Sequence, residues 1–153
     1  MKKIFLIGIL FLFACKQDRN MNDESKKIDA KPMNSSFVAS YNDKVKINKL
    51  FKSVLVEGDT IAFKELKYIF MISEHSADFL YFSTIMAEKY NYEPAFETNY
   101  QILNASKEKA MQNLAIYNLI KSYELGNRGN VQKLNKLFPN GIPNSKDCFE
   151  SNR

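Results

Sequence analysis

The chain has 153 residues, of which 45% are hydrophobic and 13% aromatic, and its net charge is +5. These values exclude a large multidomain enzyme and a collagen-like chain, and two cysteines are too few for a disulfide-stapled miniprotein. The apolar fraction is also too high for a fully disordered chain, so we expect one folded domain.

The first predicted element is an export signal over residues 1–14. Lys2 and Lys3 supply positive charge, and residues 4–14 form an uninterrupted run of apolar or small side chains. As a helix this run would be about 16 Å long, whereas the bilayer core is about 30 Å thick. The run is therefore typical of a signal peptide and not of a membrane span.

The signal ends in Leu12-Phe13-Ala14-Cys15, which resembles the lipobox of bacterial lipoproteins. That family has a leucine three residues before the cysteine and a small residue directly before it. The resemblance implies cleavage before Cys15, diacylglycerol on its thiol and acylation of the new amino terminus. The alternative is a plain secretory signal with an incidental cysteine. We expect lipid on Cys15 to hold the protein in the bacterial cell envelope.

Residues 15–40 are predicted to be the lipidated cysteine and a flexible linker, because they contain few apolar side chains and many charges of both signs. Asp18, Asp23 and Glu24 loosely resemble the surface-export signal of Bacteroidetes-type lipoproteins. We therefore expect the outer membrane, with the domain either periplasmic or exposed at the surface. Loss of Lys2 and Lys3 lowers the net charge from +5 to +3, which leaves little reason to expect a nucleic-acid partner.

A helical domain is predicted over residues 41–140, followed by a tail over residues 141–153. Helical spacing of apolar residues, together with glycine, proline and capping residues, predicts helices over residues 43–57, 60–72, 77–90, 94–103, 107–125 and 130–138. Gly58 and Gly126 are the expected stops, Asp59 caps the second helix, and Pro94 lies in the first turn of the fourth.

Certain side chains of these helices are expected to face the core. They are Val45, Leu50, Val54, Leu55, Ala62, Leu66, Ile69, Phe70, Phe79, Leu80, Ser83, Met86, Ala87, Ala95, Phe96, Asn99, Tyr100, Ala110, Leu114, Tyr117 and Leu119.

The junctions between helices recur. Gly58, Asn91 and Gly126 each end a helix just before another begins, at intervals of 33 and 35 residues. A period near 34 residues with two helices each is typical of helical-hairpin solenoids. The fold class is therefore predicted to be all-α, with about six helices as stacked antiparallel hairpins. An ordinary helical bundle is the alternative.

The third junction resembles a Sel-one-like repeat, a relative of the tetratricopeptide repeat. Lys121, Glu124, Gly126 and Asn127 match that family, whereas Tyr123 departs from its alanine. The resemblance implies a protein-interaction scaffold with a groove for a protein partner.

Six tyrosines crowd into residues 81–123, and a tyrosine left exposed in a groove would make a good interface anchor. We select Tyr81, Tyr92 and Tyr117 as candidate binding residues. Lys49 and Lys52 belong to a basic run that either is a solvated helix face or contacts anionic lipid or an acidic partner.

No catalytic residue, cofactor or metal site is predicted. His75 is the only histidine, it is expected in a solvated turn, and Cys148 lies in the predicted tail. We therefore expect a non-enzymatic protein that binds another protein. The alternatives are an immunity or inhibitor protein that neutralises a toxin or an envelope enzyme, and a cell-wall enzyme.

Overall fold

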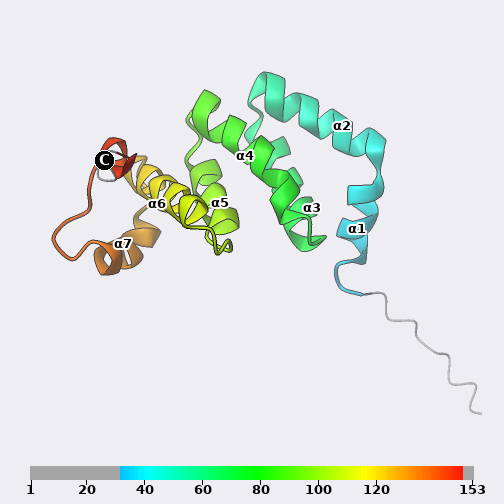
Figure 1. Cartoon of the computed structure of the whole chain (residues 1–153). Coiled ribbons are helices and arrows are strands. Elements are labelled where there is room, and N and C mark those ends of the chain that lie inside the picture. Colours follow the sequence, from blue (N-terminus) through cyan, green and yellow to red (C-terminus); the bar gives the residue numbers. More distant parts are fainter. Residues whose placement is uncertain (1–31, 150–153) are drawn as a thin grey trace, which may run out of the picture. The chain divides into compact units, whose positions relative to one another are not determined.

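The computed structural model describes residues 32–149, and the structural statements below refer to that part of the chain. It contains seven α-helices and no β-strand there, so the prediction of an all-α fold is confirmed. The helices are α1 (Ser35–Asn42), α2 (Lys44–Lys52), α3 (Thr60–Ile72), α4 (Ser76–Tyr90), α5 (Glu93–Leu103), α6 (Lys109–Glu124) and α7 (Val131–Leu137) (Figure 1). Three short segments complete the described part: a π-helical segment η1 (Ser53–Glu57) and the 3-10 helices η2 (Arg128–Asn130) and η3 (Ser145–Phe149).

The predicted signal peptide, Cys15 and most of the predicted linker lie outside the described residues. The helical part begins at Ser35, inside the linker predicted over residues 15–40, which adds one helix to the expected six. Phe37 and Tyr41 of α1 pack against the buried core, and the Tyr41 ring meets Phe70 of α3 edge-on at 5.1 Å between centroids. Phe37 and Tyr41 thus provide the apolar contacts that hold α1 against the core, although most other residues of the predicted linker are polar.

The predicted helix over residues 43–57 is found as α2 continued by η1. The Asp43 carboxylate accepts a hydrogen bond from the Lys46 N–H at 3.0 Å and so caps the start of α2. The chain leaves the helical conformation at Gly58, as predicted, with φ of +67°.

The predicted junctions are confirmed by their backbone conformation. Gly58, Asn91 and Gly126 all have positive φ, at +67°, +49° and +106°. Directly after the first of them, the Asp59 carboxylate accepts hydrogen bonds from the N–H groups of Ile61 and Ala62 at 2.8 and 3.1 Å. Left-handed residues at helix ends and a carboxylate cap at the next start turn the chain sharply, so neighbouring helices form hairpins.

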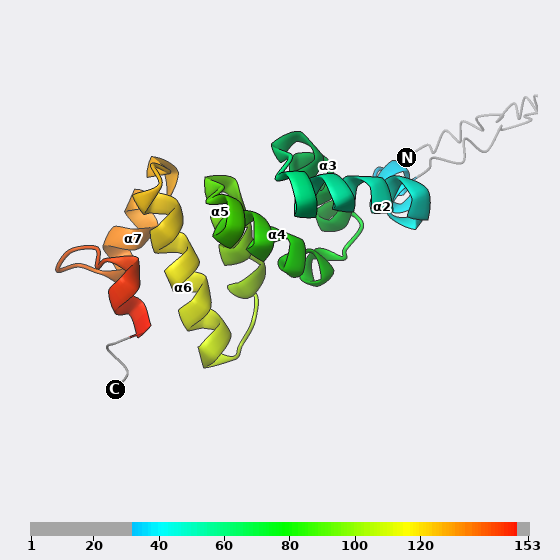
Figure 2. The ribbon, with the colours of Figure 1, turned by 90° about the horizontal axis from the view of Figure 1, so that it is seen from above.

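Helices that follow each other in the chain lie side by side. From α3 to α7 each helix contacts the next, and α1 and α2 both contact α3 (Figures 1 and 2). Two buried clusters fill the interfaces. One joins the helices from α2 to α5 and contains Ile47, Val54, Ala62, Phe63, Leu66, Ile69, Phe70, Phe79, Met86, Ala87, Ala95 and Phe96. The other joins α5, α6 and α7 and contains Tyr100, Leu103, Ala115, Leu119, Ile120 and Leu134.

The predicted inward positions are correct along α3 and at Ala95, Phe96, Asn99 and Tyr100 of α5, where all are buried. Three predictions are wrong. Val45 is 82% exposed, and Ala110 and Leu114 are also exposed. At about 100° per residue, Val45 lies about 160° around the helix from Ile47, which faces the core. Ala110 lies in the first turn of α6, before its first buried residue, Ala115. Leu114 is 37% exposed and lies at the margin of the buried face, about 40° around the helix from Asn118.

Tyr90, at the end of α4, holds the end of η1. The single proton of its hydroxyl is shared between the Leu55 and Val56 carbonyl oxygens, at 3.0 and 2.8 Å, and the Lys89 ammonium donates to the same Leu55 carbonyl at 3.1 Å. These carbonyls lie in the last turn of the segment, where helical partners run out. The Tyr90 ring also covers Gly58 so closely that a Cβ added there would lie 2.5 Å from a ring carbon.

Replacing Gly58 by alanine is therefore expected to lower the free energy of unfolding by more than backbone strain alone. An L-residue with positive φ costs about 1–3 kcal/mol, and the collision with the Tyr90 ring adds to this. Thermal unfolding followed by circular dichroism should show a loss of about 4 °C for each kcal/mol at this domain size.

A double-mutant cycle separates the two costs. In a Tyr90→Ala background the collision is gone, so Gly58→Ala should cost only the backbone strain. Equal losses of stability in the two backgrounds would show that the ring contact with Gly58 has no energetic weight.

Candidate functional site

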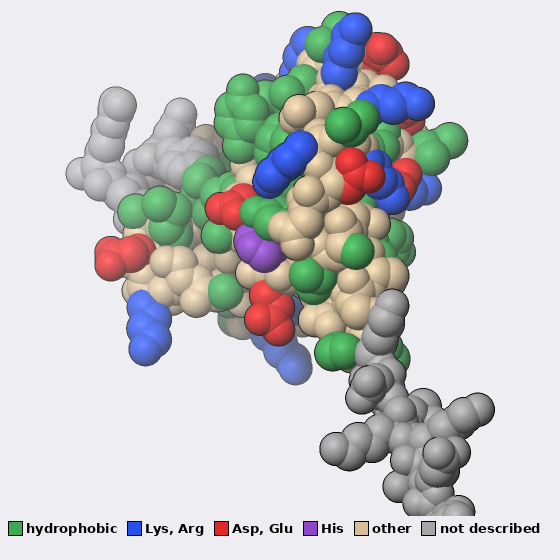
Figure 3. Space-filling model, turned by 90° about the vertical axis from the view of Figure 1, so that its right-hand side faces the viewer, with side chains coloured by type: hydrophobic (Ala, Val, Ile, Leu, Met, Phe, Trp, Pro, Cys, Tyr) green, Lys and Arg blue, Asp and Glu red, His purple; other side chains and the backbone are tan. Residues whose placement is uncertain are grey.

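An open pocket of about 290 Å³ lies where α1 and α2 face α3 and α4, and we call it the trough. All four helices contribute side chains to it. They are Tyr41 from α1, Lys44, Ile47, Asn48 and Phe51 from α2, Phe70 from α3, and Asp78 and Phe82 from α4. Figure 3 faces this end of the domain, where apolar side chains lie exposed between basic and acidic ones.

The floor of the trough is aromatic. The rings of Phe51 and Phe82 are stacked with centroids 3.9 Å apart, and Phe70 lies 5.9 Å from the first and 6.2 Å from the second. Phe70 is buried, whereas Phe51 and Phe82 are only partly buried. The trough therefore leaves part of a packed aromatic cluster open to solvent, and such recessed aromatic surface is typical of binding pockets.

The rim is polar. The Tyr41 ring is stacked on His75 at 3.7 Å, and its hydroxyl donates a hydrogen bond to the Asp78 carboxylate at 3.4 Å. The Lys44 ammonium lies 5.5 Å from the centre of the Tyr41 ring. Desolvation, and then the neighbouring Asp78 carboxylate, raise the pKa of Tyr41.

His75 lies between α3 and α4, as predicted, but it is half-buried and not a solvated turn residue. Besides the stack on Tyr41, its Nδ1 lies 3.2 Å from the Ser73 hydroxyl. The Tyr41 ring that covers His75 belongs to α1, and the sequence did not predict this helix. The single histidine thus serves to attach α1 to the turn before α4.

Of the predicted tyrosines, only Tyr81 adjoins the trough. It is 62% exposed, and its ring meets Phe82 edge-on with centroids 5.3 Å apart. Lys49 and Lys52 lie exposed in the last turn of α2 without lining the trough, while Lys44 of the same helix does line it.

Tyr92 and Tyr117 are half-buried and pack against the core formed by α2 to α5. Tyr92 meets Phe63 edge-on at 5.4 Å, and burial together with the nearby Glu93 carboxylate raises its pKa. The Tyr117 hydroxyl donates a hydrogen bond to Glu88 at 3.5 Å, and burial followed by that carboxylate raises its pKa. The three selected tyrosines therefore do not line one common pocket.

Sequence reasoning missed Phe51, Phe82, Tyr41 and Asp78 as site residues. Phe51 and Phe82 each lie next to a predicted inward position, Leu50 and Ser83 respectively. The sequence signal that could have found these two residues is an apolar stripe wider than the core face of each helix. A phenylalanine at the edge of such a stripe is partly buried and partly accessible.

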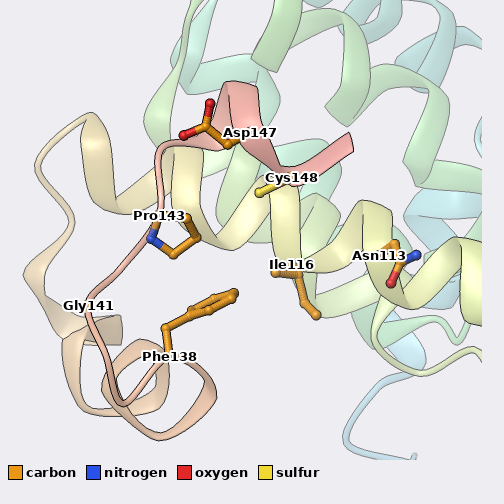
Figure 4. A pocket seen from close by; sticks show the side chains of 7 residues that line it. All are labelled: Asn113, Ile116, Phe138, Gly141, Pro143, Asp147 and Cys148. Carbon is orange, nitrogen blue, oxygen red and sulfur yellow. The ribbon is translucent and has the colours of Figure 1, made fainter. Parts of the chain in front are cut away.

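A second open pocket, of about 440 Å³, lies between α6 and the chain that follows α7 (Figure 4). Ile116 lines it from α6, and Phe138 and Pro143 line it from the loop, with the Phe138 ring extending toward Ile116. Cys148 of η3 lies at its wall. Burial, and then the Glu124 and Asp147 carboxylates, raise the pKa of this thiol, which makes it a poor nucleophile.

Glu124 fastens the predicted tail to α6. One of its carboxylate oxygens accepts a hydrogen bond from the Ser145 N–H and the other from the Ser145 hydroxyl, both at 2.8 Å, and the Lys121 ammonium lies 3.5 Å away. Desolvation would raise the pKa of Glu124, but the Ser145 hydrogen bonds and Lys121 outweigh it and lower the pKa. The tail expected over residues 141–153 thus includes the docked helix η3.

Within residues 32–149, no cluster of three or more histidine, cysteine or acidic side chains is arranged to hold a metal ion. In the same part of the chain no helix combines the length and the apolar character that a membrane span requires. Comparison with protein-family models, with curated proteins and with solved structures gave no match.

Changing Glu124 to glutamine is expected to loosen η3 and expose the Cys148 thiol, because the amide loses the charge that Ser145 and Lys121 stabilise. The rate of maleimide labelling at Cys148, followed by mass spectrometry at neutral pH, should rise several-fold. Glu108→Gln, at the opposite end of α6 and without a side-chain capping bond, is the matched control. An unchanged labelling rate for Glu124→Gln would contradict the role given to this carboxylate.

Proposed function

We propose that this chain is a lipid-anchored protein of the bacterial cell envelope that binds another protein through the trough. The observation that carries the proposal is the aromatic floor formed by Phe51, Phe70 and Phe82, part of which stays accessible in an open pocket. Stacked hairpins present such surfaces on a rigid scaffold, which lowers the entropy lost on binding. The lipobox resemblance at Cys15 and the Sel-one-like resemblance near Gly126 support the same proposal.

The volume of the trough suits insertion of side chains from a partner. Small-molecule pockets usually measure about 300–1,000 Å³ and enclose most of their ligand, whereas the trough measures about 290 Å³ and is open. Tyr81 stands exposed beside it, with a large ring area and a polar tip that suit an interface. The trough and Tyr81 together form the proposed contact surface.

Site-specific photo-cross-linking in intact cells tests the proposal. A benzophenone side chain at position 81 is expected to form an adduct with a partner protein, because Tyr81 adjoins the trough. Position 68 is the matched control, since Tyr68 of α3 is 59% exposed against 62% for Tyr81 but, unlike Tyr81, has no ring contact with a side chain that lines the trough. Adducts from position 68 alone, or from neither position, would contradict the proposed contact surface. A single small secreted partner would favour the inhibitor alternative.

The anchor has a separate test. Cys15→Ser removes the thiol that would carry diacylglycerol, and each buried CH₂ contributes about 0.8 kcal/mol to membrane binding. We expect this variant to move from the membrane fraction to the soluble fraction after centrifugation. Cys148→Ser, which removes the other cysteine, should stay with the membranes. Retention of Cys15→Ser in the membrane fraction would refute the lipid anchor.

A further inference from the structure

Helix α2 has a solvent-exposed side that is turned away from the trough. Val45 is 82% exposed there, and Lys49 and Lys52 are exposed as well. At about 100° per residue, these three side chains lie within about 60° of one another around the helix. Val56 of η1 is 64% exposed and follows Val45 by about three helical turns, so it extends the same side. We call these four residues the basic face.

The lysines of the basic face have no counter-charge. Helix α2 contains four lysines and no acidic residue, and Lys46 is paired with a carboxylate of α3 at 2.8 Å. Lys49 and Lys52 form no salt bridge with any residue between 32 and 149. The acidic residues nearest in the chain are Asp43, which caps the start of α2, and Glu57, at the end of η1. Carboxylates therefore flank the basic face and do not interrupt it.

The side chains of the basic face stand out from the helix and are not recessed. Neither open pocket described above is lined by any of the four. Phe51, which lines the trough, lies about 120° around α2 from Val45. A bilayer surface has no side chain to insert into a pocket, but it accepts exposed apolar side chains that stand beside basic ones. Contact of the basic face with lipid would also leave the trough open to a partner protein.

We propose that the basic face binds the anionic phospholipid head groups of the membrane that holds the protein. This inference rests on the lipid anchor of the proposed function and adds a direct contact between the folded domain and that membrane. Val45 and Val56 would enter the head-group region. Lys49 and Lys52 would place their ammonium groups at the phosphates and cover apolar surface with their methylene chains. Each lysine near an anionic surface strengthens binding by about fivefold.

The predicted anchor makes such a weak contact effective. Residue 32, where the described part of the chain begins, stands 17 residues after Cys15, and a chain of that length spans at most about 60 Å. Helix α1 follows directly and contacts α2. A domain held by lipid on Cys15 therefore stays close to the bilayer, where the effective concentration of head groups is high. The basic face then determines which side of the domain faces the membrane.

Tryptophan fluorescence tests the contact, because the chain contains no tryptophan of its own. Val45→Trp in the full chain is reconstituted into vesicles of phosphatidylglycerol with phosphatidylcholine, or of phosphatidylcholine alone, with acyl chains brominated as quenchers. We expect quenching in the anionic vesicles and not in the neutral ones, and Val56→Trp should behave in the same way. Met111→Trp is the control, since Met111 is also an exposed apolar residue but lies on α6, and it should stay unquenched in both.

Removal of the two charges tests the electrostatic part. In the Val45→Trp chain, Lys49→Gln with Lys52→Gln should lower the ratio of docked to free domain by about 25-fold in the anionic vesicles. Lys107→Gln with Lys109→Gln, at the start of α6, makes the same change of net charge and should leave the quenching unchanged. All of these side chains are exposed, so thermal unfolding of each variant is expected to match that of the parent chain.

Flotation of the same samples separates this inference from the proposed function, because flotation with neutral vesicles needs only the anchor. A chain that floats but is not quenched at position 45 would overturn the basic face while the anchor stands. Equal quenching at positions 45 and 111, equal quenching in both kinds of vesicle, or quenching that survives the loss of Lys49 and Lys52 would overturn it as well. A chain that is quenched at position 45 in anionic vesicles but does not float with neutral ones would refute the anchor and support the basic face.

Discussion

The packing around the Phe70 ring is the interaction on which the N-terminal half of the domain depends. Phe70 lies on α3 and meets Tyr41 of α1, Phe51 of α2, and Phe79 and Phe82 of α4, with centroid separations between 5.1 and 6.2 Å. One ring thereby joins four helices. Aromatic pairs in such tilted and edge-on arrangements gain about 0.5–1.5 kcal/mol each beyond the burial of their area. The same ring forms part of the trough floor, so the proposed contact surface and the core share the Phe70 ring.

The C-terminal half uses polar contacts between helices to a larger extent. The amides of Asn99 on α5 and Asn118 on α6 form a buried hydrogen bond of 3.0 Å, and the Ser122 hydroxyl of α6 donates to Glu93 of α5 at 2.6 Å. Asn127, just after α6, donates to the same Glu93 carboxylate at 2.8 Å. Buried polar pairs contribute little net free energy but penalise any other register, because each partner would be left unsatisfied. The α5–α6 hairpin is thus specified by polar groups, and the N-terminal helices by aromatic ones.

The position of α2 in the fold separates its lysines into two groups. A basic helix on a solvated surface carries no information about a partner, and the sequence alone leaves that interpretation open. Of the four lysines of α2, only Lys44 lines the trough, where Asp78 is the one carboxylate of the lining. Lys49 and Lys52 lie exposed in the last turn of the helix, outside the lining.

The sequence by itself determined the helices and the places where they end. Gly58, Asn91, Asp59 and Pro94 act through their own backbone or capping groups, so local chemistry predicts their positions. Only the tertiary structure decided that α1 is a helix, since Phe37 and Tyr41 are stabilised there by contacts with residues far along the chain. The trough was decided in the same way. Phe51, Phe70 and Phe82 lie on three helices, and no local pattern shows that their rings meet or that two of them stay partly accessible.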